Sequence, residues 1–237
     1  MENILNTEQH LEDENNEEIT FRNYYYEVLT PKVVLFNTLV GGDFKTLSEE
    51  DKASRIDLQI DIVSEELIKE YAVFFAKDQI EELDAIADVL FTVSYLQYQL
   101  KVCDEQGLNN LDINHDRLQF VMSQIGLFFE SMYTHFDLDI IIKATNLVVE
   151  NNMLKFTTDK EDFDKWKAPA KEKLTPSEQT VDGVTYYCLV NENGKVRKRK
   201  GFKVMDLSGL VEEQNIRDVS HSDTVYDDKE VLEDNEQ

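Results

Sequence analysis

Apolar residues recur every three or four positions along much of the chain, which is the spacing of a helix with one buried face. The clearest stretch lies between residues 48 and 76. Its apolar positions share one helical face: Ile56, Ile60, Val63, Leu67, Tyr71 and Phe74. Ser48 precedes this stretch and Asp51 stands three residues later, a pattern that resembles a capping box. The spacing therefore predicts a long helix that starts after Ser48 and ends near Ala76.

Further helices are predicted on both sides of this one. Upstream, Thr30-Pro31 suits an N-cap and a first helical position, and Gly41-Gly42 ends the pattern at about residue 40. Downstream, Lys77-Asp78 marks a tight break that would join two antiparallel helices into a hairpin. The remaining helical patterns cover residues 79–101, 116–135 and 138–153. Together they predict an all-α fold, an antiparallel bundle of about five helices.

The pattern changes after Phe156. Residues 157–182 are charged and lack apolar periodicity, so we expect a loop or lid there. Residues 184–190 are rich in β-branched and aromatic side chains, and turn residues follow at 191–194. Residues 195–198 are then expected to return as a partner strand. The helical core is thus predicted to carry a small C-terminal β-hairpin.

The charge distribution divides the chain further. The chain has 237 residues and a net charge of −25, and its first 18 residues contain many carboxylates and no Lys or Arg. From Glu212 onward the sequence is again acidic. Acidic ends with few apolar residues are typical of disordered tails that aid solubility. We therefore expect four parts: an acidic N-terminal tail (1–20), a helical core (21–156), a loop and hairpin extension (157–211) and an acidic C-terminal tail (212–237).

The composition also argues against several function classes. The excess of negative charge disfavours direct contact with the phosphate backbone of nucleic acids. No apolar run reaches the roughly 18 residues that a membrane span requires, and the acidic N-terminus resembles no targeting signal. Cys103 and Cys188 do not form a close sequence pair, so we expect no disulfide framework and a cytoplasmic location.

Carboxylates gather on the two helices that flank the break at 77–78. With about 100° of turn per residue, two sets share a face beside the apolar stripe. They are Glu66 with Glu70 on the first helix, and Glu81, Asp84 and Asp88 on the second. Either these are solvated faces of an acidic protein, or the carboxylates bind divalent cations that relieve their mutual repulsion. The second interpretation calls for two or more ions, with Mg²⁺ as the simplest choice and Mn²⁺ as an alternative.

At this hairpin the sequence resembles the all-α nucleoside triphosphate pyrophosphohydrolases. This superfamily includes MazG-like proteins and the phosphoribosyl-ATP pyrophosphohydrolase-like proteins common in bacteriophages. Its pattern is Glu-Glu-x-x-Glu followed by Glu-x-x-Asp on the next helix, and residues 81–84 (Glu-Glu-Leu-Asp) fit the second motif. Glu65 and Glu66 fit the start of the first motif, but Lys69 takes the place of its last Glu and Glu70 follows one position later. Either Glu66 and Glu70 form an i,i+4 pair, or a local bulge restores the usual spacing.

Three other segments resemble this family in the same order along the chain. They are Leu35-Phe36-Asn37, the Asn-Asn-Met-Leu-Lys sequence at 151–155, and the Asn-Gly-Lys-Val-Arg-Lys sequence at 193–198 with Asp206-Leu207. The resemblance spans about residues 33–210. It implies Mg²⁺-dependent hydrolysis of a nucleotide between its α and β phosphates, giving a monophosphate and pyrophosphate.

The resemblance also implies roles for individual residues. Glu66, Glu70 and Asp84 would be catalytic. The metal ligands would be Glu66, Glu70, Glu81, Asp84 and Asp88, with Glu65 in reserve. The substrate would contact Asn37, Asn152, Lys155, Lys195 and Lys198. We would then expect a homo-oligomer, a dimer or tetramer, in the host cytoplasm if the chain is phage-encoded. The alternatives are an acidic binding or inhibitor protein without activity, and a nucleotide sensor on the same fold.

Overall fold

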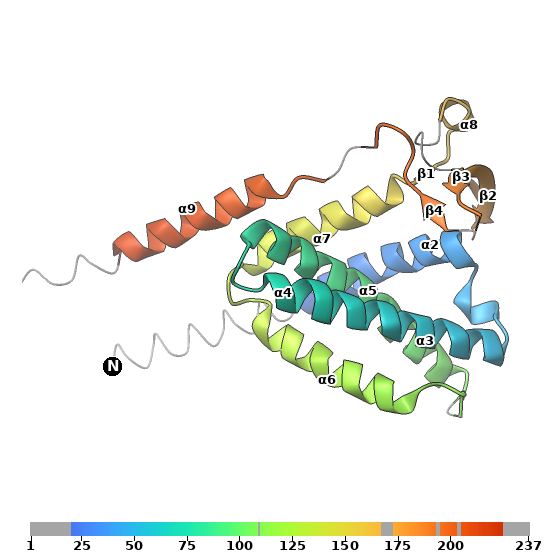
Figure 1. Cartoon of the computed structure of the whole chain (residues 1–237), viewed down its shortest axis with the longest axis horizontal. Helices are drawn as coiled ribbons and strands as arrows, with labels where there is room; N and C mark the ends of the chain where they lie inside the picture. The colour runs from blue at the N-terminus through green and yellow to red at the C-terminus, as the bar shows by residue number, and fades with distance from the viewer. Residues whose placement is uncertain (1–19, 109, 167–172, 193–194, 203–204, 225–237) are drawn as a thin grey trace, which may run out of the picture.

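Helix α5 (Gln79–Glu105) lies at the centre of the molecule, with α2, α3 and α7 packed against it (Figure 1). The computed structural model describes residues 20–108, 110–166, 173–192, 195–202 and 205–224. Fully buried side chains occur on several faces of α5, among them Leu83, Ile86, Leu90, Val93 and Leu96. A helix that is apolar on several faces must have neighbours on several faces. The burial of α5 therefore organises the bundle.

The surrounding helices agree with the predicted bundle in its coarse form. They are α2 (Thr30–Gly41), α3 (Glu49–Glu65), α6 (His115–Ser131) and α7 (Leu138–Met153), with short helical segments at η2 (Phe44–Thr46), α4 (Ala72–Phe74) and α8 (Lys160–Phe163). The capping box is confirmed, because the Asp51 amide donates a hydrogen bond of 3.1 Å to the Ser48 hydroxyl. The bounds of α7 are the predicted ones.

The predicted helix agrees with α2 in its bounds, but the expected N-cap role of Thr30 is wrong. The chain is already helical at residue 20, and a π-helical segment, η1 (Tyr24–Leu29), leads directly into α2. The Thr30 amide and hydroxyl both donate to the Tyr25 carbonyl, five residues back. Because Pro31 has no N–H, it cannot continue the α-helical ladder, and the wider π turn just before it accommodates this break. Burial of Tyr25 and Leu29 in the core favours this continuous helix.

The sheet lies at one end of the bundle and is larger than predicted (Figure 1). Its strands are β1 (Phe156–Thr157), β2 (Thr175–Val181), β3 (Val184–Val190) and β4 (Val196–Arg197), and β3 pairs antiparallel with each of the others. The predicted strand at 184–190 is confirmed, and the partner strand expected at 195–198 is present as the two residues of β4. The prediction of a loop throughout 157–182 is wrong, because β2 occupies residues 175–181. Most side chains of β2 are exposed, so the strand has no apolar alternation that the sequence could reveal.

Two features fix the sheet in place. Asp182 and Gly183 both have positive φ, at 49° and 78°, which gives the tight hairpin turn between β2 and β3. A small apolar cluster of Leu39 from α2 with Phe156, Cys188 and Val196 then seats the sheet on the end of α2. The sheet is therefore packed against the helical core through this cluster.

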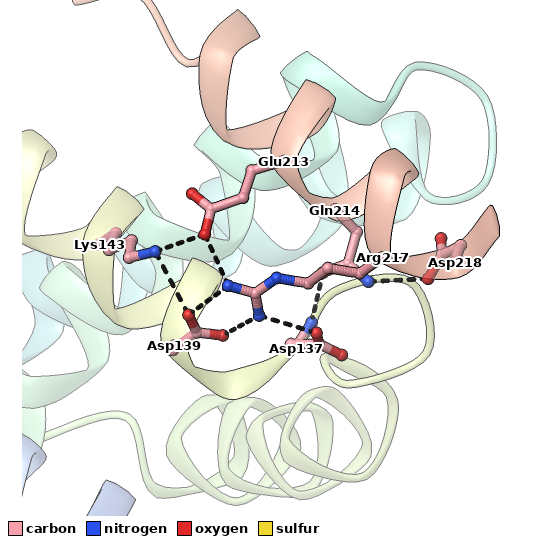
Figure 2. Close-up of polar contacts among 7 residues, drawn as sticks. All are labelled: Asp137, Asp139, Lys143, Glu213, Gln214, Arg217 and Asp218. Carbon is pink, nitrogen blue, oxygen red and sulfur yellow. Dashed lines mark hydrogen bonds and ion pairs between the residues drawn. The ribbon is translucent and has the colours of Figure 1, made fainter. Parts of the chain in front are cut away.

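The C-terminal segment also differs from the prediction. Helix α9 (Ser208–Thr224) occupies much of the region expected to be an acidic tail from residue 212. Leu207 and Val211 are buried against the bundle, and Arg217 forms ion pairs with carboxylates of α7 and its N-cap (Figure 2). These contacts offset the low apolar content that made the segment look disordered. The predicted tail residues 1–19 and 225–237 lie outside the described residues.

None of the helices within the described ranges is both long and apolar enough to cross a membrane.

The turn between α4 and α5 depends on a buried carboxylate. Ala76 has a left-handed backbone with φ of 56°, and its N–H donates to Glu82 Oε2 at 2.9 Å. Glu82 Oε1 lies 2.8 Å from Nδ1 of His135, and the Glu82 side chain is almost fully buried. The carboxylate thus holds a strained residue in place and ties the turn to the segment between α6 and α7.

Replacing this carboxylate should destabilise the fold. Glu82→Ala removes a buried acceptor from the Ala76 amide and from His135, so we expect the free energy of unfolding to fall by about 2–3 kcal/mol. Urea denaturation followed by circular dichroism measures the change. Glu81→Ala is the matched control, because Glu81 is exposed, and its effect should stay within about 0.5 kcal/mol. Equal losses in the two variants would contradict the role assigned to Glu82.

Candidate functional site

The hairpin of η3 (Glu66–Tyr71) and α5 brings carboxylates from two helices together. Leu67 and Tyr71 are buried and hold η3 against α5, which leaves Glu66 partly buried and Glu70 exposed. On α5, Asp78 caps the helix, accepting the Ile80 and Glu81 amides at 3.0 and 3.2 Å. The first turns of α5 then present Glu81, Asp84 and Asp88 on one side.

Glu66 and Glu70 lie on a π-helical segment. The Ala72 amide donates to the Leu67 carbonyl, five residues back. A π turn holds one residue more than an α turn, so it accommodates an extra residue without shifting the next apolar side chains off the core. A π-helical turn is therefore present at these two carboxylates, and the charge of Glu70 helps to raise the pKa of Glu66.

A cavity of about 270 Å³ lies against these carboxylates. Its walls come from α5, from the C-terminal half of α7 and from the segment around β4 and α9: Ile80, Glu81, Asp84, Asp88, Val148, Asn151, Asn152, Lys198, Met205 and Leu207. One wall is acidic, another presents two amides, and a third is largely apolar with one lysine. The residues come from positions up to 127 apart in sequence, Ile80 to Leu207.

Burial and mutual repulsion raise the pKa values of the carboxylates. Burial raises the pKa of Asp88 to about 7, and the charges of Asp84, Glu66 and Glu70 add to the rise. Burial also raises the pKa of Glu66 to about 6, with further contributions from Glu70 and other neighbouring carboxylates. The pKa of Asp84 is raised by burial and by the charges of Glu81 and Glu70. The structure therefore places Glu66, Glu70, Asp84 and Asp88 within electrostatic reach of one another.

Two lysines face this negative charge. Burial lowers the pKa of the Lys155 ammonium to about 8, the charge of Lys198 lowers it further, and Asp88 opposes the shift. Lys155 Nζ donates to Asn152 Oδ1 at 2.5 Å and lies 5.3 Å from the ring centre of Phe36. The charge of Lys198 lowers the pKa of Asp84 and so acts on the carboxylate side of the cavity. Cations and carboxylates thus share one site.

Six predicted residues are not among those that line the cavity: Glu65, Glu66, Glu70, Asn37, Lys155 and Lys195. Glu66, Glu70 and Lys155 lie within electrostatic reach of Asp88, whereas the other three make contacts elsewhere. Glu65 is exposed and pairs with Lys69 at 2.8 Å, a hydrogen bond that lowers the pKa of Glu65. Asn37 donates to the Val33 carbonyl of its own helix at 2.9 Å. Lys195 is exposed, and its charge helps to lower the pKa of Lys155. The structure does not bring these three side chains to the cavity wall.

The sequence interpretation missed much of the apolar wall. Ile80, Val148, Met205 and Leu207 were not singled out as site residues, and Asn151 appeared only within a motif. Apolar residues carry no local signal that separates a cavity wall from a core, so only their position in the fold identifies them. Asn151 could have been predicted as a site residue from its position beside Asn152 in the same motif.

The carboxylates at the cavity have the chemistry that suits a hard cation. They are not arranged as closely as they would be around a bound ion. Carboxylate oxygens are the preferred ligands of Mg²⁺. Among the described residues, no group of three or more His, Cys, Asp or Glu side chains stands in a metal-binding arrangement. Within the part of the chain that the structure describes, no hydrogen bond or ion pair engages the side chains of four of the carboxylates, Glu66, Glu70, Asp84 and Asp88. Their oxygens remain available to a ligand.

Comparison with known proteins gives no match to this chain. No protein-family model, no curated protein and no solved structure matches it. The resemblance of its carboxylate motifs to a pyrophosphohydrolase family therefore stays a prediction.

The raised pKa values predict that the carboxylates of this site make the protein less stable as the pH rises. Unfolded Asp and Glu lose their protons near pH 4, whereas Glu66 and Asp88 in the native chain keep theirs to about pH 6 and 7. The native state binds more protons in this interval, so its free energy of unfolding falls as the pH rises from about 4 to 7. Asp88→Asn should remove this loss. We expect the variant to be about 2 kcal/mol more stable than the wild type at pH 8, with no advantage at pH 4.

Urea denaturation at both pH values, in the presence of EDTA, measures this difference. Asp104→Asn is the matched control, because Asp104 is exposed near the other end of α5 and should shift stability equally at both pH values. A stability difference between Asp88→Asn and the wild type that does not change with pH contradicts the prediction.

Proposed function

We propose that this chain is a Mg²⁺-dependent nucleotide pyrophosphohydrolase, with Mn²⁺ as an alternative cation. It would hydrolyse a nucleoside triphosphate or a related nucleotide between the α and β phosphates. The observation that carries this proposal is the group of carboxylates from two helices that repel one another beside a cavity lined by amides and a lysine. The resemblance of the carboxylate motifs supports the same chemistry.

The carboxylates fit a site for divalent cations. Glu66, Glu70, Asp84 and Asp88 would hold the ions, and Glu81 at the cavity wall is the further candidate ligand. Bound Mg²⁺ supplies a water of lowered pKa and offsets the negative charge of the phosphates. Binding also removes the repulsion that raises the pKa values of Asp88 and Glu66, so cation binding and ionisation of these groups favour each other.

The other walls suit the rest of a nucleotide. Lys198 and Lys155 attract phosphate oxygens, and a lysine acts there as a point charge. The amides of Asn151 and Asn152 can each donate and accept, which suits a sugar or the edge of a base. Met205 and Leu207 add apolar surface that suits the face of a base. One of the ionised carboxylates would orient or deprotonate the attacking water.

Removal of a central carboxylate tests the proposal. Asp84→Asn keeps the size of the side chain and removes its charge, so we expect Mg²⁺-dependent pyrophosphate release to fall by at least about 100-fold. The assay is pyrophosphate release across ribo- and deoxyribonucleoside triphosphates, including dUTP. Glu105→Gln, an exposed carboxylate at the C-terminal end of α5, is the control and should retain wild-type activity.

The alternatives give different outcomes in the same experiments. Full activity of Asp84→Asn would sink the catalytic proposal. A nucleotide-induced rise in melting temperature without pyrophosphate release would instead indicate a nucleotide sensor. Absence of both, together with tight capture of a basic protein, would indicate an acidic binding protein. A homo-oligomer, dimer or tetramer, remains part of the proposal, and sedimentation velocity measures it.

A further inference from the structure

The cavity is lined by both charged and apolar residues. The charged residues are Glu81, Asp84, Asp88 and Lys198. The apolar residues are Ile80, Val148, Met205 and Leu207. Two of these four residues lie in the short segment that leads into α9, and Leu207 immediately precedes that helix. Part of the apolar wall therefore depends on where α9 is held.

The apolar contacts of helix α9 with the bundle are confined to its start. Leu207 and Val211 are buried in the main core and Leu210 packs against it, while Ile216 is 71% exposed. The helix lies on the outside of the bundle beside α7 (Figure 1). Beyond Val211, the contacts that the described side chains of the helix make with the bundle are therefore polar.

Arg217 is the centre of those polar contacts. Its guanidinium donates to Asp139 in bidentate fashion, at 2.7 and 2.8 Å, and to Asp137 at 3.0 Å (Figure 2). It also donates to Glu213, one turn earlier on α9, at 2.6 Å. These carboxylates include the N-cap and the first turn of α7, so the arginine joins two helices. The planar guanidinium fits this arrangement better than an ammonium does.

Two further polar side chains join α9 to the bundle. Gln214 is almost fully buried, and its carbonyl accepts the Asp137 amide at 2.9 Å. Asn215 and Gln79 exchange two amide hydrogen bonds of 3.3 Å, which tie α9 to the start of α5. Gln79 directly precedes Ile80 of the cavity wall. The Asn215–Gln79 pair thus joins α9 to the residue that precedes the cavity wall.

We infer that the segment leading into α9 forms the base-binding wall of the cavity, and that Arg217 is the positioning residue that holds it there. This inference rests on the proposed function. The phosphates would lie toward the carboxylates and Lys198, and the planar base would pack between Met205 and Leu207 on one side and Val148 and Ile80 on the other. Apolar contact with a base is largely independent of its identity, so this wall favours nucleotides over phosphate chains that have no base.

Comparing a nucleotide with a ligand that has no base tests this role. Calorimetry in Mg²⁺ would measure binding of tripolyphosphate and of the α,β-methylene analogues of ATP and dUTP. For Arg217→Ala we expect nucleotide-analogue binding to weaken at least tenfold and tripolyphosphate binding to stay within twofold of the wild type. Arg217→Lys should recover part of the loss, because it keeps the charge and loses the bidentate contact.

Two controls separate positioning from general damage. Arg117→Ala removes an arginine that pairs with Asp61 between α6 and α3, away from the cavity, and should bind every ligand as the wild type does. Hydrogen exchange should show unchanged protection of α5 and increased exchange of α9 in Arg217→Ala. Leu207→Ala should reproduce the selective loss of analogue binding with Arg217 intact.

The outcomes distinguish this inference from the proposed function. Wild-type protein that binds neither the analogues nor tripolyphosphate would overturn the proposed function and the inference with it. Wild-type protein that binds both, with Arg217→Ala weakening both equally or neither, would overturn the inference alone.

Discussion

The burial of α5 on several faces is the constraint on which the rest of the structure depends. A helix with Leu83, Ile86 and Leu90 fully buried must be covered on all the corresponding sides. The turns that carry these residues also carry Asp84 and Asp88. Core packing therefore fixes the backbone of both carboxylates, and η3 packs against the same turns with Glu66 and Glu70. Groups that repel one another are held together by apolar contacts beside them.

This arrangement lowers the stability of the chain without a ligand and favours the binding of a cation. The raised pKa values of Asp88 and Glu66 mean that ionisation at neutral pH costs free energy in the native chain. A cation or a positively charged group that enters the cavity stabilises the ionised carboxylates and offsets this free energy. Glu82 differs from its neighbour Glu81. Its carboxylate is buried and has hydrogen-bond partners within the protein, the Ala76 N–H and His135. Adjacent residues in one helix thus take different roles through the side of the helix they occupy.

The C-terminal region gives the cavity its remaining walls. β4 and the segment before α9 bring Lys198 and Leu207 to carboxylates that lie more than 100 residues earlier in the sequence. The sheet that positions β4 rests on a small apolar cluster with Leu39 of α2. The segment before α9 packs on the core through Leu207, and the ion pairs of Arg217 join the helix that follows to α7. The two supports differ in kind, so the lysine and the apolar wall can respond differently to salt and to mutation.

The sequence by itself determined the helical bundle, the capping box at Ser48, the strand at 184–190 and the clustering of acids on two adjacent helices. Each has a local cause, in periodicity, capping chemistry or β propensity. The tertiary structure alone decided the rest. The exposed strand β2 and the charged helix α9 lack apolar periodicity, and long-range pairing stabilises them. The π segment at Glu66, the pairing of Glu82 with His135 and the apolar cavity wall likewise depend on contacts between distant residues, which no local pattern specifies.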